Sequence, residues 1–198
     1  MMRLTYLSHP EVVVDPAVPV PLWSLSAAGR ARLVALLGRG WPARRPALLI
    51  HSPERKAAEA AALIGAALQL APRPDALSGE VDRSATGYVP HDRHEALADA
   101  LFARPGESAA GWETAQAAQA RILAAFRRGE AAAGKGDLLM VGHGAVGTLL
   151  LCALTGRAIA RREDQPRQGC VFSLDLGVDH RENRLLHGWL PFEQLSVT

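Results

Sequence analysis

Two apolar runs in this chain each end in a histidine, and this pattern limits the possible folds more than any other feature. The first run, Arg3–Ser8, leads into His9, and the second, Leu138–Gly142, leads into His143. Each run has the length and composition of a buried strand, and the residues after each histidine are of the kind that ends a strand. Ligands of open α/β sheets bind at the carboxyl ends of parallel strands. We therefore expect His9 and His143 to meet at one site.

The rest of the chain alternates between helix-like and strand-like segments. Ser26 is a good N-cap for a helix, and Ser52 followed by Pro53 has the pattern of a second helix start. The sequence predicts helices from Ser26 to about Leu37, Ser52 to about Leu70, Arg93 to Ala103, Ser108 or Thr114 to about Arg128 and His143 to about Leu154, further strands over Ala47–His51, Val171–Leu176 and Arg184–Leu190, and a hairpin connection over Gly177–Asn183. This order predicts a single α/β domain over residues 1–198, a three-layer sandwich in which helices cover both faces of a mixed, mainly parallel sheet.

Composition excludes several kinds of partner. The 198 residues carry a formal net charge of +2, and the arginines are spread along the chain, so no nucleic-acid surface is expected. The segment Leu138–Gly156 is as long as a membrane span, but its histidine and glycines favour a strand, a turn and a buried helix. Cys152 and Cys170 lie in apolar runs, as core residues do in a reducing compartment. With no signal peptide expected, these features predict a cytoplasmic protein without a membrane partner.

Five short motifs occur along the chain in a fixed order. They are Ser8-His9-Pro10-Glu11, Leu25-Ser26-Ala27-Ala28-Gly29, Ser52-Pro53-Glu54-Arg55-Lys56-Ala57, Gly106-Glu107-Ser108 and Val141-Gly142-His143-Gly144. Together they resemble the histidine phosphatase superfamily, the phosphoglycerate-mutase-like proteins, and the resemblance covers nearly the whole chain. It implies the phosphoglycerate-mutase-like fold and a phosphomonoester-hydrolase type of pocket.

The resemblance also implies roles for individual residues. His9 would attack phosphorus and become a phosphohistidine, and His143 would be a second contact to the phosphoryl group. Glu80, in Leu77-Ser78-Gly79-Glu80, is the candidate acid that protonates the leaving oxygen, with Asp82 as the alternative. Glu80 can also be read as a solvated loop carboxylate. Further contacts to the phosphate or substrate are expected from Ser8, Ser52, Lys56 and Gly144.

Three positions depart from the family pattern. Ser8 and Lys56 stand where the family has arginines, and Pro10 stands where it has glycine. Lys56 lacks the planar fork of a guanidinium, and the neighbouring Arg55 projects elsewhere around the helix. Weakening two charge-assisted contacts would raise the barrier by about 3–6 kcal/mol, or roughly two to four decades in rate. Arginines from elsewhere, such as Arg3 or Arg83, are candidates to refill the site.

These observations leave three hypotheses open. The chain is a divergent phosphatase that uses His9, a non-catalytic binder of a phosphorylated or anionic small molecule, or a metal site formed by His9, His51, His143 and an acidic residue. The ligand spacing is unlike that of common zinc motifs, so we expect no metal and no other cofactor. A hydrolase is favoured over a mutase, because 198 residues leave little room for segments that exclude water. Whether the chain forms a homodimer stays open.

A segment of about residues 79–105 is expected to form an irregular cap over the pocket. Its arginines Arg93 and Arg104 suggest anionic ligands, and the polar stretch His91–His94 is expected to be exposed. His180 and His187 fall in the predicted hairpin and are read as structural or solvent-facing. The tryptophans Trp23, Trp41, Trp112 and Trp189 are expected to fill the core or cover helix ends, since no basic stripe accompanies them.

Overall fold

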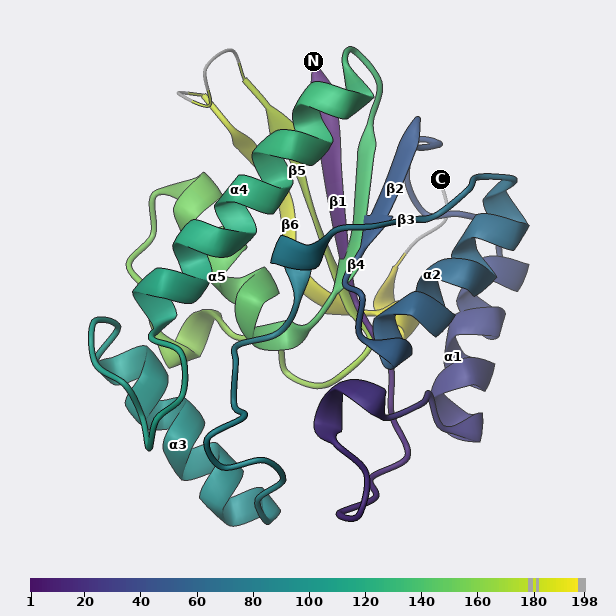
Figure 1. Ribbon diagram of the computed structural model, residues 1–198. Coiled ribbons are helices and arrows are strands. Elements are labelled where there is room, and N and C mark those ends of the chain that lie inside the picture. Colours follow the sequence, from purple (N-terminus) through teal and green to yellow (C-terminus); the bar gives the residue numbers. More distant parts are fainter. Residues whose placement is uncertain (178–179, 181, 196–198) are drawn as a thin grey trace.

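The computed structural model describes residues 1–177, 180 and 182–195, and within them six strands form one mixed sheet in the order β3-β2-β4-β1-β5-β6 (Figure 1). The strands are β1 (Met2–Ser8), β2 (Leu48–His51), β3 (Arg73–Pro74), β4 (Leu138–Gly142), β5 (Cys170–Leu176) and β6 (Arg184–Pro191). The pairs β1–β4, β4–β2 and β2–β3 are parallel, and β5 pairs antiparallel with both β1 and β6. The predicted sheet is confirmed, although residues 178, 179 and 181 of its hairpin connection lie outside the described residues.

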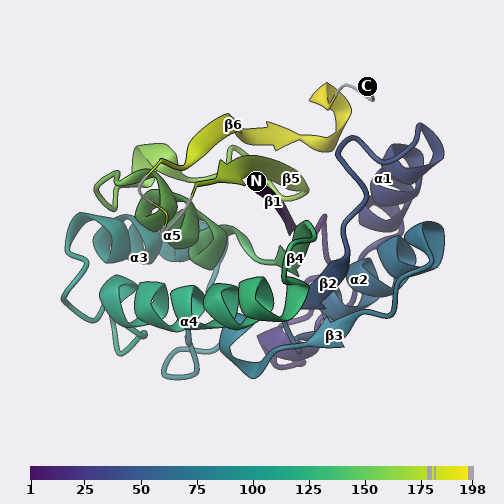
Figure 2. The same ribbon diagram turned by 90° about the horizontal axis from the view of Figure 1, so that it is seen from above.

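Helices cover both faces of this sheet, which confirms the three-layer α/β sandwich. The helices are α1 (Ala27–Gly38), α2 (Arg55–Leu68), α3 (His91–Ala103), α4 (Ala115–Ala133) and α5 (Gly144–Thr155). Seen from above, α1 and α2 lie on one side of the central strands and α4 and α5 on the other (Figure 2). Alternate side chains of β4 pack against the two helical layers. Leu139 lies in the hydrophobic cluster that includes residues of α1 and α2, and Met140 lies in the cluster that includes residues of α4 and α5. Burial on both faces explains why the central strands read as continuous apolar runs.

The register between β1 and β4 sets the place of the two histidines. The strands pair from Leu4 with Leu138 to Ser8 with Gly142, so both end at the same level of the sheet. The backbone N–H of His9 then donates to the Gly142 carbonyl at 2.9 Å, which extends the pairing by one further bond.

Helix starts agree with the sequence prediction except at α2 and at α3, which begins at His91 rather than Arg93. The Ser26 side chain caps α1 by accepting from the Gly29 N–H at 3.0 Å. The predicted start at Ser52 and Pro53 is wrong, because α2 begins at Arg55 with Glu54 as its N-cap. The Ser52 hydroxyl instead accepts from the Glu54 N–H at 3.2 Å, which turns the chain before the helix starts.

The remaining fold predictions concern the membrane and the cysteines. None of the helices that the structure describes is long and apolar enough to cross a membrane. The apolar segment Leu138–Gly156 forms β4 and α5, as the sequence predicted. Cys152 and Cys170 are both buried free thiols.

Gly29 allows the loop after β1 to lie directly against α1. A Cβ atom on Gly29 would stand 2.2 Å from the Glu11 carbonyl oxygen, a distance that real Cβ atoms do not reach. The Ser26 N–H donates to that same carbonyl at 2.8 Å. The glycine of the Leu25–Gly29 motif is thus required where the chain that follows His9 crosses the helix.

We predict that Gly29→Ala destabilises the protein by about 1–3 kcal/mol, because the added methyl forces backbone apart. Gly38→Ala is the matched control in the same helix, since nothing lies within 4 Å of a Cβ there. The free energy of unfolding of the control should lie within about 0.5 kcal/mol of the wild-type value or slightly above it. Urea unfolding of the two variants measures the difference, and equal midpoints would contradict the close approach at Gly29.

Candidate active site

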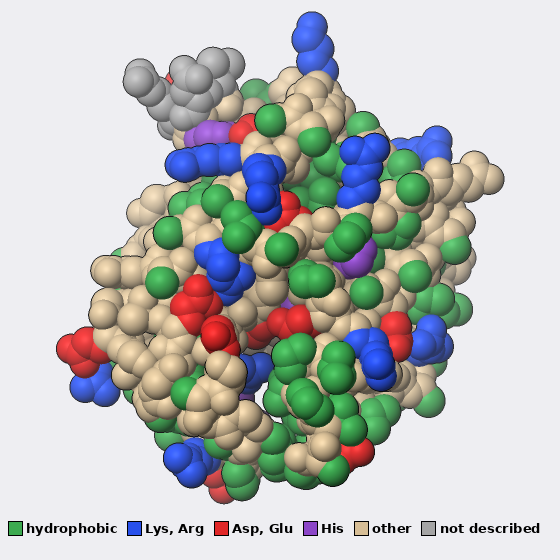
Figure 3. Space-filling model, in the orientation of Figure 1, with side chains coloured by type: hydrophobic (Ala, Val, Ile, Leu, Met, Phe, Trp, Pro, Cys, Tyr) green, Lys and Arg blue, Asp and Glu red, His purple; other side chains and the backbone are tan. Residues whose placement is uncertain are grey.

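A cavity of about 510 Å³ opens at the carboxyl ends of β1 and β4. Its buried end holds polar and small residues, His9, Lys56, Glu80, Arg83, Gly144 and Gln165. Its outer end is formed by the loop after β1, the loop before α3 and α3 itself. The space-filling view shows a hollow in this lower part of the molecule, with hydrophobic side chains along one side of it (Figure 3).

His9 is held in the form that a nucleophile requires. Its Nδ1 lies 2.8 Å from the Pro10 carbonyl oxygen. Because a carbonyl only accepts, Nδ1 carries the proton, and Nε2 of the neutral ring keeps its lone pair. Burial lowers the pKa of His9 from 6.5 to about 4, so the ring is neutral near pH 7. Pro10, a departure from the family pattern, supplies the carbonyl that fixes this tautomer.

His143 lies beside His9 but does not line the cavity. The two ring centroids are 5.1 Å apart and the rings meet edge to face, as the strand ends predicted. His143 and Ser52 are both fully buried, however, and the expectation that they line the cavity is wrong. The reason is that His143 Nε2 is bonded to the Ser52 hydroxyl at 2.7 Å and lies 3.4 Å from Glu54 Oε1. Burial lowers the pKa of His143 well below its usual value, so this ring is also neutral.

Glu54 and Lys56 form an ion pair at the buried end of the site. The Lys56 ammonium donates to Glu54 Oε2 and, at 3.0 Å, to the Val20 carbonyl. The other Glu54 oxygen accepts from the Glu80 N–H at 2.9 Å. Although burial opposes it, the nearby His143 ring, the Lys56 ammonium and the bond from the Glu80 N–H together lower the pKa of Glu54 to about 2. Glu54 therefore largely compensates the positive charge that Lys56 presents to a ligand.

Ser8 is engaged in bonds at the end of the sheet. Its hydroxyl donates to Gln165 Oε1 at 2.5 Å and accepts from the Cys170 N–H at 3.0 Å. Gln165 lines the cavity and packs against Gly144, where a Cβ would stand 2.2 Å from the Gln165 amide nitrogen. At the position of the family's first arginine, this chain thus has a hydroxyl that bonds the Gln165 amide, and the absence of a side chain on Gly144 leaves room for that amide at the cavity wall.

Glu80 lies in the cavity, at the start of α5. One of its carboxylate oxygens accepts from the Val146 N–H at 3.1 Å and the other from the Ala145 N–H at 3.4 Å. Burial raises the pKa of Glu80, against the opposing effects of Arg83 and these N–H groups. A carboxyl with a raised pKa that faces a cavity suits a proton donor. Asp82 is exposed, lies outside this cavity and has a lowered pKa caused by bonds from Ser84, so it suits that role poorly.

Of the two candidates Arg3 and Arg83, Arg83 reaches the site, and Arg161 and Arg167 also line the cavity. Arg83 lines the cavity, donates to His94 Nε2 at 2.5 Å and lies 5.4 Å from the ring centre of Trp112. Arg3 does not refill the site, because it pairs with Asp175 at the opposite end of β1.

Three more arginines of the sequence analysis also stay away from the cavity. Arg55, Arg93 and Arg104 are exposed and do not line it, which corrects the suggestion made for the last two. Arg55 and Arg93 lie on the solvent-facing sides of α2 and α3, and Arg104 follows the end of α3.

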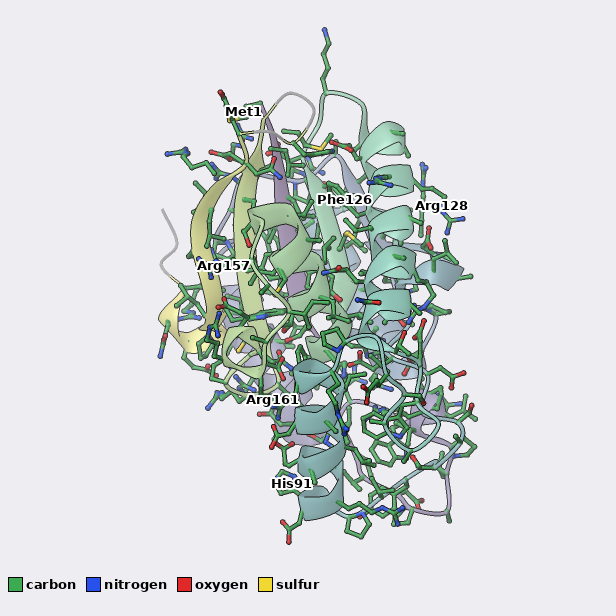
Figure 4. All side chains as sticks on the ribbon, turned by 90° about the vertical axis from the view of Figure 1, so that its left-hand side faces the viewer. Met1, His91, Phe126, Arg128, Arg157 and Arg161 are labelled. Carbon is green, nitrogen blue, oxygen red and sulfur yellow. The ribbon has the colours of Figure 1, made fainter. Side chains whose placement is uncertain are left out.

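The segment of residues 79–105 lines the cavity, but it is not irregular throughout. Its second half is α3, whose His94 is half-buried and bonded to Arg83 rather than exposed. Arg161 pairs with Glu95 on α3 and with Asp164, both at 2.5 Å. Figure 4 shows Arg161 beside this helix and His91 at the helix end farthest from it. Through these ion pairs, Arg161 links α3 to the chain segment that precedes β5.

The metal hypothesis gains no support from the geometry. Among the residues that the structure describes, no three His, Cys, Asp or Glu side chains are grouped as they are around a metal ion. His51 Nδ1 is bonded to the Ser52 carbonyl at 2.7 Å.

Comparisons with known proteins agree with this fold. A family model described as histidine phosphatase superfamily (branch 1) matches residues 22–187. The chain therefore belongs to the histidine phosphatase superfamily. The match begins after His9, so the role of His9 depends on its geometry. No sequence among the curated proteins matches.

Solved structures of similar fold cover the chain almost completely. A mycobacterial glucosyl-3-phosphoglycerate phosphatase in complex with inorganic phosphate is 22% identical, with a TM-score of 0.76 over 98% of this chain and 99% of that chain. The alpha-ribazole phosphatase from Shigella flexneri is 18% identical, with a TM-score of 0.72 over 96% of this chain and 97% of that chain. At these identities the likeness concerns the fold.

Sequence reasoning missed two charged residues and one role of an aromatic residue. Glu54 stands where the family motif has leucine, two residues before Lys56, and that acidic substitution was the available signal. Arg161 carried no local signal, because its partners on α3 are distant in sequence. Trp23 caps the end of the short 3-10 helix Val20–Leu22, but it also lines the outer part of the cavity, which the sequence did not predict.

We predict that Glu54→Gln strengthens the binding of inorganic phosphate by about ten- to hundredfold, because it frees the Lys56 ammonium for the anion. Glu107→Gln is the control, since it removes the same charge from an exposed pair with Arg104. Calorimetric titration with phosphate compares the two variants with the wild type. Unchanged affinity in Glu54→Gln, with its thermal unfolding intact, would contradict the compensation of Lys56 by Glu54.

Proposed function

We propose that the protein hydrolyses small phosphomonoesters through a phosphohistidine on His9. The observation that carries the proposal is the free Nε2 of His9, in a cavity that also holds Lys56, Arg83 and Glu80. Family membership supports a phosphatase type of chemistry. The ligand is a small phosphorylated molecule, and the reaction needs no cofactor.

The reaction has two balanced steps. His9 Nε2 attacks phosphorus as the phosphorus–oxygen bond to the alcohol breaks, and Glu80 gives its proton to the leaving oxygen. The positive charge on the phosphorylated ring is stabilised by the bond from Nδ1–H to the Pro10 carbonyl. Water then attacks phosphorus as the phosphorus–nitrogen bond breaks, and it gives a proton to the Glu80 carboxylate, which releases phosphate and neutral His9. Lys56 and Arg83 stabilise the charge on the phosphoryl oxygens in both steps.

A non-catalytic binder of an anionic small molecule is the second candidate. It is favoured by the burial of His143 and by the pairing of Lys56 with Glu54. Both leave fewer side chains available to stabilise a phosphoryl group during its transfer. The two candidates share the pocket and differ in turnover.

We predict that His9→Ala abolishes hydrolysis over a panel of alkyl and aryl phosphomonoesters, whereas His187→Ala, outside the cavity on β6, leaves it unchanged. Glu80→Gln should slow alkyl esters by roughly 10²–10⁴-fold and nitrophenyl phosphate much less, because nitrophenolate leaves without a proton. Phosphate release measures both. Hydrolysis that persists in His9→Ala would contradict the proposal, and phosphate binding without any His9-dependent turnover would favour the binder.

A further inference from the structure

One side of the outer half of the cavity is lined by apolar side chains that no step of the proposed reaction uses. Val12, Val14, Val20 and Trp23 come from the loop after β1, and Tyr88 and Val89 come from the loop before α3. Val14 is 55% exposed and Tyr88 is 38% exposed, although both are large apolar or aromatic residues. Exposed apolar side chains that converge on a cavity mark the place of an apolar ligand group.

The two aromatic rings lie beside each other at the cavity wall. The Trp23 indole N–H donates to the Asp15 carbonyl at 2.9 Å and to the Val18 carbonyl at 3.0 Å, so its polar group is satisfied within its own loop. The Trp23 and Tyr88 ring centroids are 5.9 Å apart with a tilt of 57°. Two tilted rings at the cavity wall suit contact with one further flat ring.

The buried and outer ends of the cavity are directly connected. Lys56, at the buried end, donates to the Val20 carbonyl of the apolar loop at 3.0 Å. A ligand whose anionic group contacts Lys56 therefore extends along this loop toward Trp23.

The positive charges around the outer end are already paired with carboxylates. Arg161 contacts Glu95, Asp99 and Asp164, and Arg167 pairs with Glu193 at 2.9 Å. Arg83, at the buried end beside Lys56, is bonded to the His94 ring instead, so attraction for an anion is expected at that end. The cavity thus combines an anion-binding end with an apolar, aromatic end.

We propose that the cavity takes aryl or arylalkyl phosphomonoesters, with the phosphoryl group at His9 and the ring against Trp23 and Tyr88. This inference rests on the proposed function, whose site it deepens. A volume of about 510 Å³ suits a ligand of this size. Aromatic contact with Trp23 and Tyr88 favours such a ring.

The test compares two stable phosphonates that cannot be hydrolysed, benzylphosphonate and methylphosphonate, by calorimetric titration of the wild-type protein. We expect benzylphosphonate to bind about tenfold tighter, and Trp23→Ala to remove this preference while methylphosphonate binds as before. Leu22→Ala is the matched control, because Leu22 is the neighbouring residue, is 47% exposed and does not line the cavity. Tyr88→Ala is a second variant in the other loop, should Trp23→Ala fail to fold.

Each outcome distinguishes the inference from the proposed function. A preference for benzylphosphonate that is lost in Trp23→Ala or Tyr88→Ala and kept in Leu22→Ala supports the aromatic subsite. Equal binding of the two phosphonates overturns the subsite and leaves hydrolysis at His9 intact. The expected preference without hydrolysis of benzyl phosphate supports the subsite and overturns the proposed hydrolysis. Failure of both phosphonates to bind overturns both.

Discussion

The parallel pairing of β1 with β4 is the constraint on which the site depends. It places Ser8 opposite Gly142 and lets the His9 N–H continue the ladder to the Gly142 carbonyl. Both histidines then leave the sheet at one level, with their ring centroids 5.1 Å apart. A slip of one residue would turn every side chain of β1 to the opposite face and separate the rings. Packing of the sheet between two helical layers makes this register costly to change.

The site that this register creates is balanced in charge rather than strongly positive. Ser8 and Lys56 replace two arginines of the family pattern, and each is matched by its surroundings. The Ser8 hydroxyl donates a hydrogen bond to the Gln165 amide, and Lys56 is paired with Glu54. The neutral rings of His9 and His143 add no charge near pH 7. A ligand therefore gains less from its negative charge than in a site with two arginines, and contacts made by the rest of the ligand gain importance.

The fold and the position of the site could be predicted from the sequence, whereas the bonding within the site could not. The apolar runs before His9 and His143, the Ser26 cap and the Leu138–Gly156 strand–turn–helix are local patterns with a strong physical meaning. The start of α2 was placed wrongly, because a serine followed by proline satisfies the local rule while the Ser52 hydroxyl is used by His143. Glu54, Arg83 and Arg161 act through partners distant in sequence, and only the folded chain brings these partners together.

The central claim is that the Pro10 carbonyl and burial keep His9 neutral with a free Nε2. Nitrogen NMR of the histidine rings tests it most directly, with His9→Gln to assign the signals. The account predicts the Nδ1–H tautomer for His9 at neutral pH and a pKa of about 4. Because this pKa is lowered, the ring should stay unprotonated until the pH falls to that value. An Nε2–H tautomer, or titration near the usual 6.5, would contradict the account.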